Sequence, residues 1–96
     1  MGGGQLVPLY KVVLHKRARK GLQSLTGNRR VEAEAFLSDF LPLTPLKRVP
    51  GKTKKLRGAY EKAGYLQYDL PDGCRAQYRV DDEAKVVYVD YLDHHP

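Results

Sequence analysis

Between residues 74 and 80, apolar and polar side chains alternate at every position. One set is Cys74, Ala76, Tyr78 and Val80, and the other is Arg75, Gln77 and Arg79. Side chains of a strand point to opposite faces with a period of two, so this pattern predicts a strand with one apolar and one cationic face. Turn-forming residues flank it at 71–73 and 81–83. We therefore expect a strand inside a sheet, with a hairpin on each side and Arg75 directed away from the core.

Three further stretches are rich in strand-forming residues, at 7–15, 65–70 and 85–92. The last two lie on either side of 74–80 and are separated from it only by turns. These three consecutive strands predict an antiparallel meander, with residues 93–96 left as a polar tail.

A helical period separates the first strand from the meander. Ala18, Leu22 and Leu25 are spaced four and three apart, which predicts one apolar helix face. A second amphipathic helix is predicted from residue 29 to about 41, with Asn28 as its N-cap. The order strand-helix-helix-strand-strand-strand predicts a small α+β domain: an antiparallel sheet with a helical hairpin packed on one face. We expect this domain to span residues 7–96, after a disordered lead-in at 1–6.

The charge is distributed unevenly along the 96 residues, whose net charge is +6. Residues 1–68 hold 14 Lys/Arg and 4 Asp/Glu, whereas residues 69–96 hold 3 and 7. The stretch 47–57 contains six cations and no acid: Lys47, Arg48, Lys52, Lys54, Lys55 and Arg57. We interpret this stretch as an irregular loop that contacts phosphates, because cations packed this densely repel one another unless an anion neutralises them. For the basic part as a whole, a polyanion partner and lysines kept for solubility both remain open.

Several features point to the cytoplasm. No apolar run is long enough to cross a membrane, and the N-terminus does not have the pattern of a signal peptide. The one cysteine, Cys74, cannot form an internal disulfide and lies on the apolar side of its strand. We expect a buried structural thiol rather than a nucleophile.

Two groups are candidates for chemistry beside Arg75. His94 and His95 could bind a metal, belong to a disordered tail, or transfer protons near neutral pH at the end of a strand. Tyr68 could stack on a base if it flanks Arg75 across the hairpin, although most of the tyrosines should pack in the sheet.

The element order and several local motifs resemble the RelE/ParE superfamily of bacterial and archaeal toxins. The specific parts are Lys55-Leu56-Arg57-Gly58 and the strand that runs from Gly73 through Arg75 and Tyr78 to residues 81–83. The resemblance extends from about Tyr10 to His95. It implies a sheet flanked by helices, with the active surface on the meander strands.

In the RelE branch, the resemblance implies cleavage of mRNA in the ribosomal A site, by attack of a ribose 2′-hydroxyl on the adjacent phosphate and without metal or cofactor. Arg75 matches the strand arginine that contacts the scissile phosphate, and His95 or His94 matches an Arg or His after the last strand. The strand 65–70 lacks the lysines of several RelE toxins, so Tyr68 or a histidine is expected to transfer protons. The expected RNA-binding residues are Lys52, Lys54, Lys55, Arg57 and Arg79.

The resemblance leaves three functions open. The first is a RelE-like toxin that cleaves mRNA, with mRNA, the ribosome and a cognate antitoxin bearing an acidic segment as partners, and without a role at membranes. The second is a ParE-like toxin that inhibits DNA gyrase and cleaves nothing. The third is a degenerate, non-catalytic binding protein with the same fold.

Overall fold

The computed structural model describes residues 8–94. Its strands are β1 (Lys11–Leu14), β2 (Thr53–Lys55), β3 (Tyr65–Asp69), β4 (Cys74–Asp81) and β5 (Val86–His94). Its helices are α1 (Lys16–Ser24), α2 (Gly27–Ala35) and the short α3 (Ala59–Lys62), together with a π-helical turn η1 (Phe36–Phe40) and a 3₁₀ turn η2 (Pro71–Gly73). The predicted α+β class is confirmed.

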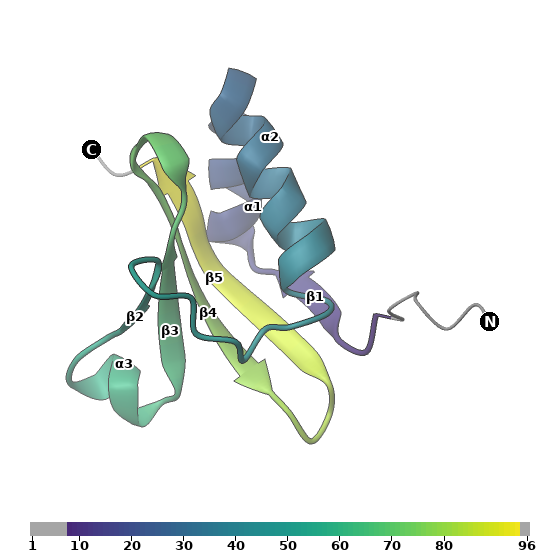
Figure 1. Cartoon of the computed structure of the whole chain (residues 1–96), viewed down its shortest axis with the longest axis vertical. Helices are drawn as coiled ribbons and strands as arrows, with labels where there is room; N and C mark the ends of the chain where they lie inside the picture. The colour runs from purple at the N-terminus through teal and green to yellow at the C-terminus, as the bar shows by residue number, and fades with distance from the viewer. Residues whose placement is uncertain (1–7, 95–96) are drawn as a thin grey trace.

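The strands form one mixed sheet in the order β1-β5-β4-β3-β2 (Figure 1). The predicted meander is confirmed, because β4 pairs antiparallel with both β3 and β5 and lies at the centre of the sheet. β1 pairs parallel with β5, which requires a crossover, and α1 and α2 lie on the path of that crossover.

The helical hairpin covers one face of the sheet. α1 and α2 lie on the same side of it (Figure 1), and the fully buried residues Ala76, Tyr78, Val87, Val89 and Leu92 point toward them. The opposite side is the open face, defined by the residues that alternate with this core set. From β3 to β5 it comprises Tyr65, Gln67, Asp69, Arg75, Gln77, Arg79, Tyr88, Asp90, Tyr91 and Asp93.

α1 approaches β5 without a side chain between them at Gly21. A Cβ atom at this position would lie 1.9 Å from the carbonyl oxygen of Leu92, far inside van der Waals contact. β1 pairs with β5 only as far as Leu14 and Val89. α1 therefore lies against β5 beyond the end of β1, in a position that only glycine permits.

Several sequence-based boundaries were wrong. The basic stretch 47–57 is not wholly irregular, because Thr53–Lys55 pairs with β3 as β2, and α3 was not predicted. β5 continues through His94, so part of the predicted polar tail is strand. The N-cap of α2 is Thr26 rather than Asn28, whose amide donates to the Asp72 carboxylate instead (3.2 Å).

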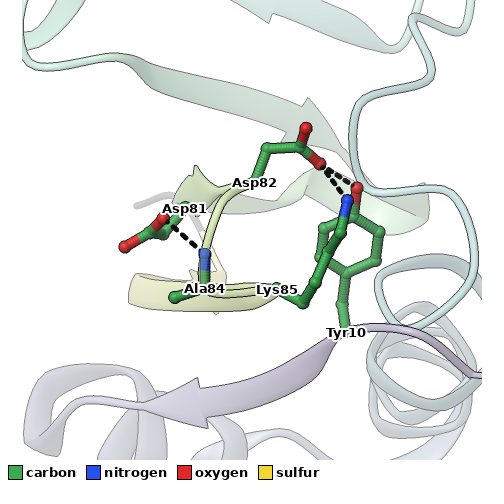
Figure 2. A network of polar contacts seen from close by, with 5 residues as sticks. All are labelled: Tyr10, Asp81, Asp82, Ala84 and Lys85. Carbon is green, nitrogen blue, oxygen red and sulfur yellow. Dashed lines mark hydrogen bonds and ion pairs between the residues drawn. The ribbon is translucent and has the colours of Figure 1, made fainter.

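A polar network closes the turn between β4 and β5 against the start of β1 (Figure 2). The Tyr10 hydroxyl donates to Asp82 Oδ1, and the Lys85 ammonium donates to the same oxygen (2.9 Å) while lying 5.1 Å from the centre of the Tyr10 ring. The Asp81 carboxylate accepts from the backbone N–H of Ala84. The hydrogen bond with Asp82 raises the pKa of Tyr10 above 10.0 and that of Lys85 above 10.5, and the hydrogen bond from Tyr10 lowers the pKa of Asp82 below 3.8.

These shifts predict a pH window for the network. The contributions of Tyr10 and Lys85 are present below their unfolded pKa values and are lost as the pH rises through the folded ones, whereas that of Asp82 is lost as the pH falls below 3.8. The difference in melting temperature between the wild type and Tyr10→Phe should be small, because the site is exposed, and largest near neutral pH. It should shrink below pH 4 and above pH 10; a difference independent of pH would contradict this assignment.

The hydroxyl of Tyr78 is a polar group inside the hydrophobic core. The side chain is fully buried, and its oxygen has no hydrogen-bond partner among residues 8–94. Burial raises the pKa of Tyr78 to about 12. The ring packs edge-on against Phe36, with the centroids 5.8 Å apart.

We predict that Tyr78→Phe stabilises the protein. The substitution keeps the ring and removes a desolvated hydroxyl, so the free energy of unfolding should rise by about 1 kcal/mol. Denaturant titration of both proteins measures the change. A loss of stability would mean that the hydroxyl has a hydrogen-bond partner after all.

Candidate functional site

Arg75 occupies the open face at the start of the central strand. Its register neighbours are both acids, Asp69 on β3 and Asp93 on β5. Its guanidinium nevertheless makes no ion pair or side-chain hydrogen bond with any residue in 8–94. A depression of about 300 Å³ lies beside it, lined by Asp69, Leu70, Gly73, Cys74 and Arg75. The strand therefore holds a partly exposed cation beside a space that could admit an anion.

Both flanking acids are engaged elsewhere. The Asp69 carboxylate accepts from Lys54 Nζ (2.7 Å) and from Gln67 Nε2 (2.9 Å). Burial alone would raise the pKa of Asp69, but the hydrogen bonds from Lys54 and Gln67 and the charge of Arg75 outweigh it, so the pKa lies below its usual value. The Asp93 carboxylate accepts from Ser24 Oγ (3.3 Å) and from the backbone N–H of His94 (2.7 Å). These bonds hold the acids in place and leave Arg75 available to a ligand.

Arg79 lies on the same face of β4 as Arg75, with Gln77 between them. Its guanidinium carbon lies 4.6 Å from the centre of the Tyr88 ring, a stacking contact across the β4–β5 pair. Tyr65 lies opposite Arg79 on β3. Its hydrogen bond with Asp90 is the main cause that raises the pKa of Tyr65, and burial adds to it, while Arg79 acts in the opposite direction.

Sequence reasoning missed a second group on this face. His15, at the junction of β1 and α1, places Nδ1 2.5 Å from Asp90 Oδ1, and its ring lies 5.8 Å from that of Tyr88. Asp90 Oδ1 accepts no hydrogen bond of regular geometry from residues 8–94. We infer that Nδ1 carries a proton, because an unprotonated nitrogen would repel the carboxylate oxygen at this distance. From α1, Arg17 lies 4.9 Å above the centre of the Tyr91 ring.

The structure does not place Tyr68 beside Arg75. Tyr68 pairs with Ala76, so its ring points to the helix side, 4.6 Å from the ring of Phe36 and 5.0 Å from that of Phe40. The expectation that Tyr68 flanks Arg75 across the hairpin was wrong, and Asp69 takes that position. His94 pairs with Cys74 rather than with Arg75, and it lies next to Gly73 at the rim of the depression. His95 lies outside the described residues.

The basic stretch divides among different surfaces. Lys54 reaches the open face through Asp69, whereas Lys55 pairs with Leu66 on the helix side. Lys52 lines a hollow of about 170 Å³ together with Tyr68 and residues of α2 and η1. Arg57 is exposed between β2 and α3. Only Lys54 and Arg79 of the expected RNA-binding residues therefore share the face of Arg75.

Three observations limit the chemistry of residues 8–94. No group of three or more His, Cys, Asp or Glu side chains in this range could hold a metal ion. Burial raises the pKa of the Cys74 thiol, and the residue is 2% exposed, which confirms the prediction of a buried cysteine. No helix in this range is long and apolar enough to span a membrane.

Comparison with known proteins identifies the fold. No protein-family model and no curated protein sequence matches the chain, but solved structures do. The RelBE2 toxin-antitoxin complex of Mycobacterium tuberculosis contains a chain that is 29% identical, with a TM-score of 0.71 over 93% of this chain and 100% of that one. The isolated RelE toxin of E. coli is 26% identical, with a TM-score of 0.67 over 91% and 85%.

A third structure, the YoeB/ParE toxin of Agrobacterium tumefaciens, is 25% identical, with a TM-score of 0.68 over 90% of this chain and 99% of that one. These likenesses span nearly the whole described fold. The chain belongs to the RelE/ParE toxin superfamily.

Proposed function

We propose that this protein is the toxin of a toxin-antitoxin system and inhibits translation by cutting mRNA on the ribosome, in the cytoplasm. The observation that carries this proposal is Arg75. It is fixed on the central strand, it lies beside an open depression, and it forms no ion pair with the acids on either side of it within residues 8–94. A cation held in place but left unneutralised is what the charge of a reacting phosphate requires.

The proposed reaction needs no metal. The 2′-hydroxyl of a ribose loses a proton and attacks the adjacent phosphorus, and the bond to the 5′-oxygen of the next nucleotide breaks as that oxygen gains a proton. Arg75 would stabilise the negative charge of the intermediate, and either His94, at the end of β5, or His95 would transfer a proton. We assign no proton transfer to Tyr68, because its ring is packed against Phe36 and Phe40.

The remaining cations would bind RNA at a distance from the reacting phosphate. Lys54 and Arg79 lie on the open face with Arg75. Lys52, Lys55 and Arg57 point to other surfaces, and we propose that they contact ribosomal RNA. The pairing of β2 with β3 sends Lys54 and Lys55 to opposite sides of the sheet, whereas Lys52 and Arg57 lie outside β2.

A cognate antitoxin is the expected protein partner. The toxin-antitoxin complex from Mycobacterium tuberculosis is among the structures this chain resembles, and the net charge of +6 favours an antitoxin with an acidic segment. The affinity of the complex should therefore fall as the salt concentration rises.

Expression without an antitoxin tests the function. Mapping of mRNA 5′ ends after induction should show discrete new cuts within coding regions, together with arrest of growth. A ParE-like inhibitor of gyrase would instead induce the DNA damage response without mRNA cuts, and a degenerate binding protein would not slow growth. Either result would overturn the proposal.

A further inference from the structure

The open face carries a second cluster of interacting side chains, of which the proposed function uses only Arg79. It consists of two arginine–tyrosine stacks and a histidine–aspartate pair: Arg17 with Tyr91, Arg79 with Tyr88, and His15 with Asp90. Its members come from the β1–α1 junction, α1, β4 and β5. Convergence of polar groups from so many elements on one surface is typical of a binding site.

The two arginines are preorganised for a planar anionic ligand. Stacking on Tyr91 and Tyr88 fixes each guanidinium over a ring, at 4.9 Å for Arg17 and 4.6 Å for Arg79. Neither lies within ion-pair distance of a carboxylate in residues 8–94. Arg17 therefore retains one open face and its N–H edge, which suit a nucleobase and a phosphate respectively, whereas the guanidinium of Arg79 also contacts the Tyr65 hydroxyl.

His15 lies against the ring of Tyr88 and is oriented by Asp90. The carboxylate lies 2.5 Å from Nδ1, so the other ring nitrogen, Nε2, is the one left for a ligand. The His15 side chain is 49% exposed, and its ring is supported by Tyr88. The imidazole can therefore form a hydrogen bond with a ribose hydroxyl or a phosphate oxygen.

The position of the cluster relative to Arg75 matches a nucleotide two positions along an extended single strand, beyond the adjacent one. Arg75 and Arg79 project from the same face of β4, four residues and therefore about 13 Å apart along the strand. The His15–Asp90 pair lies beside Gln77, at the point where a bulge interrupts the β4–β5 register. Gln77 lies between Arg75 and Arg79 on β4. An extended single strand with one phosphate at Arg75 would pass over the cluster.

We propose that His15, Arg17 and Arg79 form a second nucleotide subsite, which binds the ribose-phosphate of single-stranded RNA two nucleotides along from the one held at Arg75. The inference rests on the proposed function, because it takes the Arg75 site as an RNA site. The stacked guanidinium groups favour RNA over an acidic peptide, because their planes can stack on a nucleobase, which glutamate and aspartate do not have.

Binding of a cleavage-resistant RNA tests the subsite. The purified toxin is titrated with a labelled 2′-fluoro RNA tetranucleotide by fluorescence anisotropy at several salt concentrations, and a 2′-fluoro dinucleotide is measured by competition. His15→Gln and Arg17→Gln should each weaken tetranucleotide binding about tenfold and leave dinucleotide binding within twofold. Arg17→Gln should also reduce the slope of log affinity against log salt by about 0.7, the value of one lost phosphate contact on a single strand.

Two further variants separate charge from stacking. Arg17→Lys keeps the charge without the planar group, so it should retain the salt slope and still lose affinity. Lys20→Gln removes a charge from an exposed position of α1 outside the cluster and should bind both RNAs as the wild type does. Melting temperatures of all variants confirm that each protein is folded.

The outcomes distinguish a failure of the proposed subsite from a failure of the proposed function. If Arg75→Ala loses binding while the His15 and Arg17 variants bind like the wild type, the subsite is wrong and the proposed function stands. If the wild type binds neither RNA, the subsite is overturned, and mapping of mRNA cuts decides the function by itself. If the variants lose affinity for a glutamate-rich peptide but not for RNA, the cluster binds protein and the proposal is wrong.

Discussion

Gly21→Ala is expected to lower the free energy of unfolding by about 3 kcal/mol, at the upper end of the cost of overpacking. The added methyl group would lie 1.9 Å from the Leu92 carbonyl oxygen, which belongs to the backbone of β5 and cannot move aside as a side chain could. Helix propensity acts in the opposite direction, since alanine is favoured over glycine by about 1 kcal/mol. A loss of stability would therefore indicate that α1 contacts the β5 backbone at Gly21, whereas a gain would indicate that it does not.

Thermal unfolding measures this effect. For a domain of this size, the loss corresponds to a melting temperature lower by about 12 °C or more. Gln23→Ala is the matched control, because Gln23 is exposed in the same helix and its replacement should change stability by no more than about 0.5 kcal/mol. A Gly21→Ala protein as stable as the wild type would show that α1 does not contact the β5 backbone at this point.

Arg75→Ala is expected to reduce mRNA cleavage about 1000-fold, which is the scale of losing one preorganised charge donor at a reacting centre. Growth inhibition should disappear with it. Folding should be nearly unaffected, because the guanidinium forms no ion pair within residues 8–94. Arg75→Ala should therefore lose activity while its stability stays nearly unchanged.

Two variants control for the charge. Arg75→Lys keeps the positive charge but not the forked geometry that matches phosphate oxygens, so it should retain part of the activity. Arg30→Ala is the control, because it removes a cation from α2, away from the open face. Arg30 Nε lies 3.6 Å from Glu34 Oε1. This variant should remain as toxic as the wild type. Full toxicity of Arg75→Ala, at equal protein level, would contradict the assignment of Arg75.

The sequence was sufficient to predict the meander because its signals are local. Strict alternation and turn residues define β4 and both hairpins, and they place Arg75 opposite the core. The same signals could not give the register of β3 against β4. The turn η2 makes Asp69, not Tyr68, the neighbour of Arg75, and a shift of one residue moves a side chain to the other face.

The cluster that contains His15, Arg17 and Arg79 could not be predicted from the sequence, for a different reason. It depends on the parallel pairing of β1 with β5, on the bulge beside Gln77, and on the contact at Gly21. These bring residues 15 and 90 together across the chain. No spacing or motif records such a contact, although the lone Gly21 within a helical pattern was a usable signal of close packing.

Cleavage in a reconstituted system tests the central claim most directly. Purified toxin is added to ribosomes stalled on a defined mRNA, and the mRNA 5′ ends are mapped for the wild type, Arg75→Ala and Arg30→Ala. We predict discrete cuts with the wild type and with Arg30→Ala, and an approximately 1000-fold slower reaction with Arg75→Ala. Intact mRNA with the wild-type toxin, or equal cutting by Arg75→Ala, would contradict the proposal that Arg75 is the centre of an mRNA-cleaving site.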